Sequence, residues 1–96
     1  MGKIFVKWET ASEIDTAGFN LYRATSENGD YSRINDLLIL SEGSSTQGAS
    51  YKFLDKDVNN GKTYYYQLED IDLNGTSTNH GPISATPRWI FWIFGK

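Results

Sequence analysis

Residue types that could perform catalysis or bind a metal form no recognisable constellation in this 96-residue chain. His80 is the only histidine, and cysteine is absent. Nucleophilic catalysis needs a base beside its nucleophile, and a metal site needs several ligands close together. No such partner is visible near His80, so we expect a solvated histidine in a loop or strand. The sequence predicts no catalytic residue, no metal site and no cofactor, and therefore a protein that is not an enzyme.

A second candidate is Asp70-Ile71-Asp72-Leu73-Asn74-Gly75, which matches the first half of an EF-hand calcium loop. Oxygen-bearing side chains occupy its first, third and fifth places and glycine its sixth. The twelfth place should be glutamate but is Gly81, and no helical pattern flanks the segment. We therefore favour a β-hairpin in which Asn74-Gly75 forms a type I′ turn, with a weak calcium contact as the alternative.

A third candidate is Tyr64-Tyr65-Tyr66, whose rings could stack on bases or sugars. Strand alternation turns Tyr64 and Tyr66 inward and leaves Tyr65 outward, beside Tyr22 as a cross-strand pair. A stacking platform needs several exposed rings. The sequence therefore favours core packing with a single surface tyrosine.

The elements that position these residues are β-strands. Apolar and polar residues alternate with a period of two, and turn signals recur about every 8–14 residues, which is typical of a β-sandwich or barrel. The expected strands cover residues 4–9, 19–23, 31–34, 51–55, 64–68 and 76–86. The core is predicted to contain Trp8, Phe19, Leu21, Tyr51, Phe53, Tyr64, Tyr66 and Leu68.

The segments between these strands are less uniform. We expect a loop over residues 10–18 and a mobile loop over residues 41–48, where serine and glycine are frequent. Residues 36–40 fit either a short strand or one helical turn. Pro82 predicts that the last strand lies at a sheet edge, because proline cannot donate to a ladder.

Composition sets further bounds. The length suits one domain, and the absence of cysteine excludes disulfides. The net charge is −3 with acids and bases interleaved, so nucleic acid, which favours a basic patch, is not an expected partner. The N-terminus shows no secretory signal pattern.

The order of the motifs resembles fibronectin type III domains. Trp8 is similar to their core tryptophan, the segment Gly18 to Arg23 to their third strand, and Tyr64 to the residue of the tyrosine corner. The segment Gly81 to Thr86 resembles their last strand, and residues 8–23 as a whole resemble a variant found in large bacterial surface proteins.

This resemblance implies an immunoglobulin-like β-sandwich of two antiparallel sheets over residues 1–87, in which the usual first strand is missing. It also implies a non-catalytic structural or interaction module of a secreted or cell-surface bacterial protein. We therefore expect an extracellular location as part of a longer chain, and a protein as the partner.

The tail, residues 88–96, departs from the family pattern because it contains six consecutive apolar residues. This run is too short to cross a bilayer, which needs about 20 residues. We favour a substitute first strand beside Ile4 to Trp8; the alternatives are packing in a dimer and docking at a membrane interface. The residues of this candidate interaction segment are Trp89, Ile90, Phe91, Trp92, Ile93 and Phe94.

Overall fold

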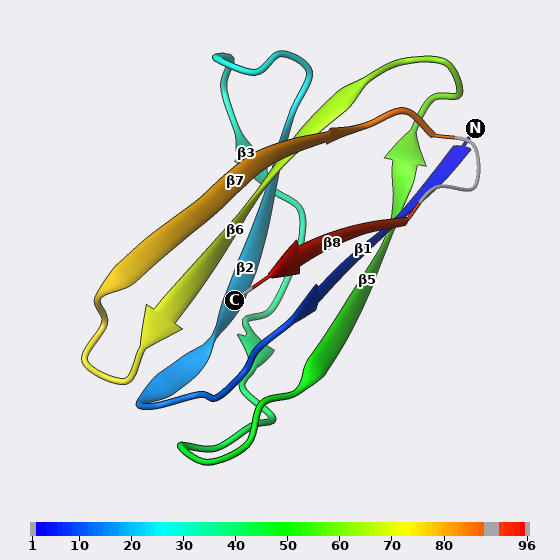
Figure 1. Ribbon diagram of the computed structural model, residues 1–96. Helices are drawn as coiled ribbons and strands as arrows, with labels where there is room; N and C mark the ends of the chain where they lie inside the picture. Colours follow the sequence, from blue (N-terminus) through cyan, green and yellow to red (C-terminus); the bar gives the residue numbers. More distant parts are fainter. Residues whose placement is uncertain (1, 88–90, 96) are drawn as a thin grey trace.

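In the computed structural model, all regular structure among the described residues is β-strand (Figure 1). The structure describes residues 2–87 with their side chains, and the backbone of residues 91–95. In chain order, the strands are β1 (Gly2–Glu9), β2 (Thr16–Ala24), β3 (Ser32–Arg33), β4 (Ile39–Leu40), β5 (Ser50–Val58), β6 (Tyr64–Asp72), β7 (Ser77–Ala85) and β8 (Phe91–Gly95).

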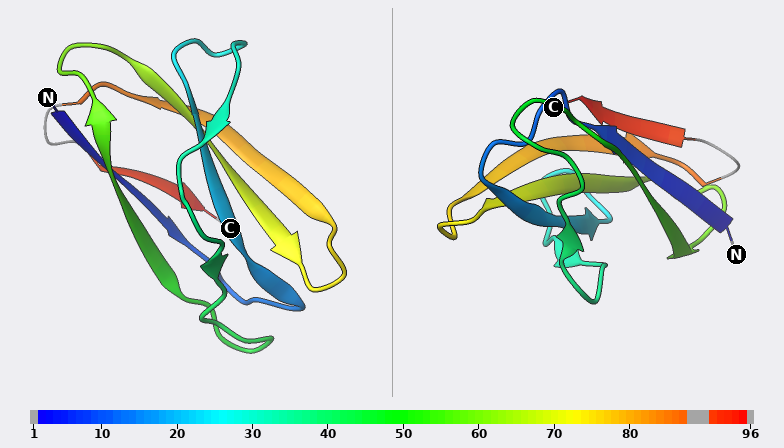
Figure 2. Two further views of the ribbon diagram at one scale, coloured as in Figure 1. Left: turned by 180° about the vertical axis from the view of Figure 1, so that it is seen from behind. Right: turned by 90° about the horizontal axis from the view of Figure 1, so that it is seen from below.

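The strands form two layers, which the two views of Figure 2 separate. The smaller sheet has the order β5-β1-β8, and the larger has the order β3-β2-β6-β7 with β4 also pairing with β2. Neighbouring strands are antiparallel except for β8, which runs parallel to β1. The predicted all-β, sandwich-like fold is confirmed, and β8, from the C-terminal tail, pairs with the edge of β1 as expected.

The core follows from alternation in the strands of both sheets. Trp8 of β1 stacks on Tyr51 of β5 with ring centroids 5.2 Å apart, and Phe19 of β2 lies 4.9 Å from the Tyr51 ring. Burying such rings removes about 150–250 Å² of surface each, so they dominate the energetics of a small core. The buried apolar residues of this core are Ile4, Val6, Trp8, Phe19, Leu21, Tyr51, Val58, Tyr64, Tyr66, Leu68 and Ala85, and Phe53 packs against them half-buried.

The turn into β6 has the geometry of a tyrosine corner. Tyr64 is 4% exposed, and its hydroxyl oxygen accepts a hydrogen bond of 2.8 Å from the backbone N–H of Asn59, five residues earlier. Gly61 lies between them with a φ of 81°, a left-handed conformation that glycine adopts without steric cost. The hydrogen bond therefore fixes where the chain crosses from the smaller sheet to the larger one.

Several expected boundaries differ from the structure. β5 does not end near Asp55 but continues to Val58. A register shift against β1 lets the side chains of both Asp55 and Val58 face inward, although they are three residues apart. β2 begins at Thr16, inside the expected loop, and pairs there with Asp72. The ambiguous segment at residues 36–40 contains the short strand β4, which pairs with Gly18.

The β6–β7 turn is not of type I′. That type needs positive φ at both central residues, whereas only Gly75, at 89°, has it here. The N–H of Gly75 donates to the carbonyl of Asp72, and that of Asp72 donates to the carbonyl of Thr76. This pattern is a three-residue loop that closes on a left-handed glycine. Pro82 lies on β7, which is the edge strand of the larger sheet, as expected.

Candidate functional site

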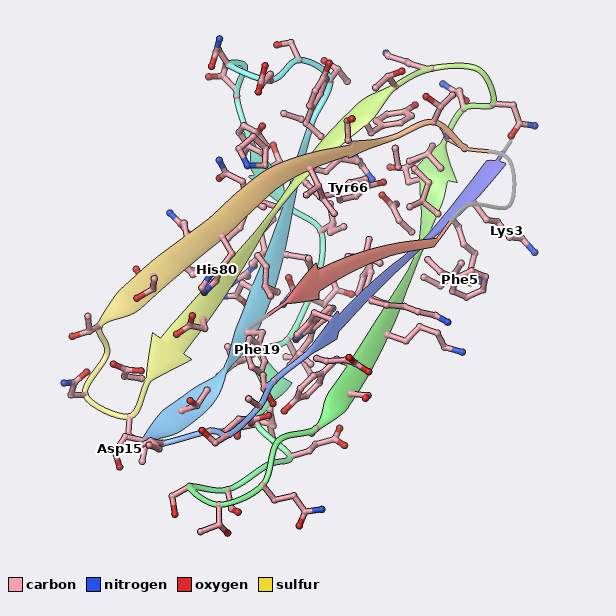
Figure 3. All side chains as sticks on the ribbon, in the orientation of Figure 1. Lys3, Phe5, Asp15, Phe19, Tyr66 and His80 are labelled. Atoms are coloured by element: carbon pink, nitrogen blue, oxygen red, sulfur yellow. The ribbon has the colours of Figure 1, made fainter. Side chains whose placement is uncertain are left out.

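Asp55 is a buried acid that joins the two sheets. Its side chain lies on β5 in the smaller sheet, and the residue is 3% exposed. Arg23 of β2 approaches both carboxylate oxygens through Nη1, at 2.8 and 2.9 Å, and the Tyr66 hydroxyl of β6 donates to Oδ2 at 2.8 Å. Tyr66 is fully buried (Figure 3), and burial together with Asp55 raises the pKa of its phenol. The Asp55 carboxylate therefore links the two sheets, because both of its partners belong to the larger sheet.

Glu13 is a second buried acid, in the loop between β1 and β2. The hydroxyls of Thr10 and Tyr51 donate to Oε2 at 2.5 and 2.6 Å. Oε1 accepts from the Ser41 hydroxyl and from the Gly43 N–H. Burial alone would raise the pKa of Glu13, but the donors outweigh it and lower the pKa to about 2. The first residues of the segment expected to be a mobile loop are thus tied to an ionised carboxylate.

His80 pairs with Asp70 across the β6–β7 hairpin, where Figure 3 labels it. Its Nε2 lies 2.5 Å from Oδ2 of Asp70, and the two side chains are 30% and 10% exposed. His80 stands opposite the buried Leu68, so it points to the inward side of the sheet. His80 therefore lies on a strand, as one of the expected alternatives, but it is only partly solvated and is paired with Asp70. The two residues are ten positions apart, and only the hairpin register brings them together.

The contact with His80 engages Asp70, which is the first residue of the segment that resembles half of an EF-hand loop. Asp70, Ile71 and Asp72 belong to β6, and Leu73, Asn74 and Gly75 form the hairpin turn. In the part of the chain that the structure describes, no group of three or more His, Cys, Asp and Glu side chains could hold a metal ion. The geometry of the segment is that of a strand end and a turn.

The outer face of the larger sheet carries a row of polar and aromatic side chains. Alternation turns Tyr22 and Glu69 outward, because Leu21 and Leu68 beside them are buried. The Tyr22 hydroxyl donates to Oε1 of Glu69 at 2.9 Å, and Nδ2 of Asn20 donates to the same oxygen at 3.1 Å. Burial and this hydrogen bond raise the pKa of Tyr22, so its phenol remains a neutral donor.

Two more tyrosines lie one row further along this face. Tyr65 stands opposite Ala24, and Ser32 stands opposite Arg23, which places Tyr31 on the other side of Ala24. Tyr31 and Tyr65 are both half-buried and therefore keep part of each ring in solvent. The sequence suggested that Tyr22 and Tyr65 form a cross-strand pair. In the structure, Tyr22 stands opposite Gln67 and is therefore the diagonal neighbour of Tyr65.

We call these outward residues the tyrosine face. Alternation alone placed Tyr65 outward, but sequence reasoning missed the gathering of three rings, because it depends on the register of β2 against β3 and β6. Asn20 is on the same face but only 5% exposed, and Asn35 donates to its Oδ1 at 2.9 Å. The tyrosine face consists of Asn20, Tyr22, Tyr31, Arg33, Tyr65, Gln67 and Glu69.

The apolar tail provides the other candidate interaction site. The backbone of residues 91–95 forms β8, in which Phe91 stands opposite Phe5 and Gly95 opposite Glu9. Trp89 and Ile90 lie outside the described residues, as do the side chains of Phe91, Trp92, Ile93 and Phe94. Within the described residues, no helix has the length and apolar character needed to span a membrane.

Comparisons with known proteins give one similarity. No protein-family model matches the chain, and no solved structure matches it. Among curated proteins, it is similar to an amylopullulanase of Thermoanaerobacter thermohydrosulfuricus, with 26% identity over 86 residues. The match covers 88% of this chain but 5% of that protein, so the chain spans a small part of its relative.

The Glu13 cluster gives a testable pH dependence. The folded pKa of about 2 lies below the ordinary value of 4.5, so Glu13 stabilises the fold fully above pH 4.5. This contribution is lost as the pH falls from about 4.5 towards 2. We expect Glu13→Gln to lower the free energy of unfolding at pH 7 by about 2–4 kcal/mol, measured by urea denaturation.

The same measurement at pH 3 should show a smaller difference between Glu13→Gln and the parent chain. Glu27→Gln is the matched control because Glu27 is exposed, and it should change stability by less than about 0.5 kcal/mol. A Glu13→Gln variant as stable as the parent at pH 7, or a difference that does not shrink in acid, would contradict the role of Glu13.

Proposed function

We propose that this chain is a non-catalytic module of the fibronectin type III kind, which acts as a spacer and contact surface within a longer extracellular or cell-surface protein. The single observation that carries the proposal is the similarity to an amylopullulanase, in which a match across 88% of this chain accounts for 5% of the relative. A self-contained sandwich that occupies so small a part of a long protein is suited to an accessory role.

The topology supports the family assignment within this proposal. The larger sheet brings β3, β2, β6 and β7 together, and the smaller pairs β1 with β5. This division of strands and the Tyr64 corner are features of fibronectin type III and related immunoglobulin-like domains. The tail strand β8 occupies the edge of β1 that the family's first strand would cover.

The interior supports a non-catalytic role. The buried carboxylates Asp55 and Glu13 are each surrounded by donors from neighbouring strands and loops of the same chain. Acids held in this way stabilise a fold, whereas a catalytic acid or base must reach a substrate proton. His80 and Asp70 form another titratable pair among the described residues, and they face the inward side of a hairpin.

The experiment is a hydrolysis assay on the purified 96-residue chain with pullulan and starch as substrates. We expect no release of reducing ends above buffer, together with one cooperative unfolding transition seen by both tryptophan fluorescence and circular dichroism. Asp70→Asn provides a check on the origin of any activity. Turnover that is abolished by Asp70→Asn would overturn the proposal of a non-catalytic module.

A second candidate function is self-association through the tail. One observation favours it: β8 ends the smaller sheet, and its outer edge has no strand partner in the described part of the chain. Such an edge can pair with another chain. Docking of the tail at a membrane is the remaining proposal, and no described contact favours it.

Truncation at Pro87 separates these candidates. We expect the full chain to be a monomer by light scattering, and the truncated chain to be a monomer that is less stable by about 1–3 kcal/mol, because the edge of β1 loses its ladder. A dimeric full chain that becomes a stable monomer on truncation would favour self-association instead. Co-sedimentation with vesicles that is lost on truncation would favour the membrane.

A further inference from the structure

We infer that the tyrosine face binds a neutral polysaccharide chain. This inference rests on the proposed function, since it assigns a ligand to the contact surface of the module. Its residues come from β2 and β6 and from the residue before β3, and they lie on the side of the larger sheet that faces away from the smaller one. The face is therefore not used to hold the sandwich together.

The three rings provide apolar surface at neighbouring positions. Tyr65 stands opposite Ala24, which is 4% exposed. Tyr31 directly precedes Ser32, the partner of Arg23, so the β2–β3 register extended by one residue places Tyr31 on the other side of Ala24. Tyr22 is the diagonal neighbour of Tyr65, a spacing of about 7–8 Å between strands. Each ring is half-buried, so its base is held by the sheet while part of its surface contacts solvent.

Polar groups lie beside these rings. Oε1 of Glu69 accepts from Tyr22 and Asn20, while Oε2 accepts no hydrogen bond from any described residue. The amide of Gln67, opposite Tyr22, can both donate and accept. A half-buried carboxylate oxygen and an amide, next to aromatic rings, offer acceptors and donors to a ligand that carries hydroxyl groups.

Sugar rings have the matching chemistry. A pyranose presents an apolar face of C–H groups, which packs on an aromatic ring, and a rim of hydroxyls, which bind amides and carboxylates. Nucleic acid fits poorly, because Arg33, opposite Tyr22, is offset on this face by the Glu69 carboxylate, and the chain carries a net charge of −3. The rings are mounted on paired strands, so little conformational entropy is lost when a ligand binds.

The length of the face favours a chain over a single sugar. The three rings fall on two successive rows of the sheet, with Tyr31 and Tyr65 in one row and Tyr22 in the next. Successive residues of a polysaccharide can therefore contact successive rings. The similarity to an amylopullulanase makes glucans the first ligands to try.

The test is affinity electrophoresis of the full chain in native gels that contain pullulan or soluble starch. We expect retardation that increases with polysaccharide concentration. Tyr65→Ala and Tyr22→Ala should each weaken the apparent affinity by about tenfold, which is the effect of removing one stacking aromatic side chain from proteins that bind nucleic-acid bases. Tyr65→Phe keeps the ring and should bind within about twofold of the parent chain.

The matched control is Phe5→Ala, which removes a half-buried ring from the outer side of the smaller sheet, on the other layer (Figure 3). It should leave the retardation unchanged, and urea denaturation shows that each variant is folded. Absence of retardation by either glucan, or retardation that persists in the folded alanine variants, would overturn the inference. A protein partner captured through Tyr22 and Tyr65 without any glucan binding would overturn it too.

The two proposals fail in different ways. A folded, inactive chain that binds no glucan removes the polysaccharide site and leaves the accessory module in place. Turnover of pullulan that depends on Asp70 removes the non-catalytic module, whatever the tyrosine variants do.

Discussion

The ionic contact of Asp55 with Arg23, supported by the Tyr66 hydroxyl, is the constraint on which the rest of the structure depends. A buried carboxylate without partners costs several kcal/mol, and here the partners belong to the opposite sheet. The acid is therefore satisfied only when β5 faces β2 and β6 in one register. Hydrophobic rings such as Trp8 and Phe19 favour any close packing of the layers, whereas this contact selects a particular alignment.

The same alignment decides what lies outside. Because Arg23 and Tyr66 turn inward, Tyr22 and Tyr65 must turn outward on their strands. The polar contacts of the core and the ring positions of the tyrosine face are thus two consequences of one register. At the end of the sandwich, Glu13 performs a similar task by tying the β1–β2 loop to the segment after β4.

Much of this fold could be predicted from the sequence, because alternation is a local pattern. The inward parity of Tyr51 and Tyr66 follows from it, as does the sandwich itself. Asp55 shares the inward parity of Tyr51, but alternation does not reveal what would pair with a buried acid there, because its partners Arg23 and Tyr66 belong to other strands. The partners of Glu13 and His80 could not be found, because they are set by tertiary neighbours that no local spacing encodes.

Native-state hydrogen exchange tests most directly whether the Asp55 contact makes the two sheets one cooperative unit. Amides of β1 and β5 in the smaller sheet, and of β2 and β6 in the larger, should exchange with a common free energy equal to that of global unfolding. In Asp55→Asn, all four strands should lose protection together. Protection that falls in β5 alone, with β2 and β6 unchanged, would contradict the account.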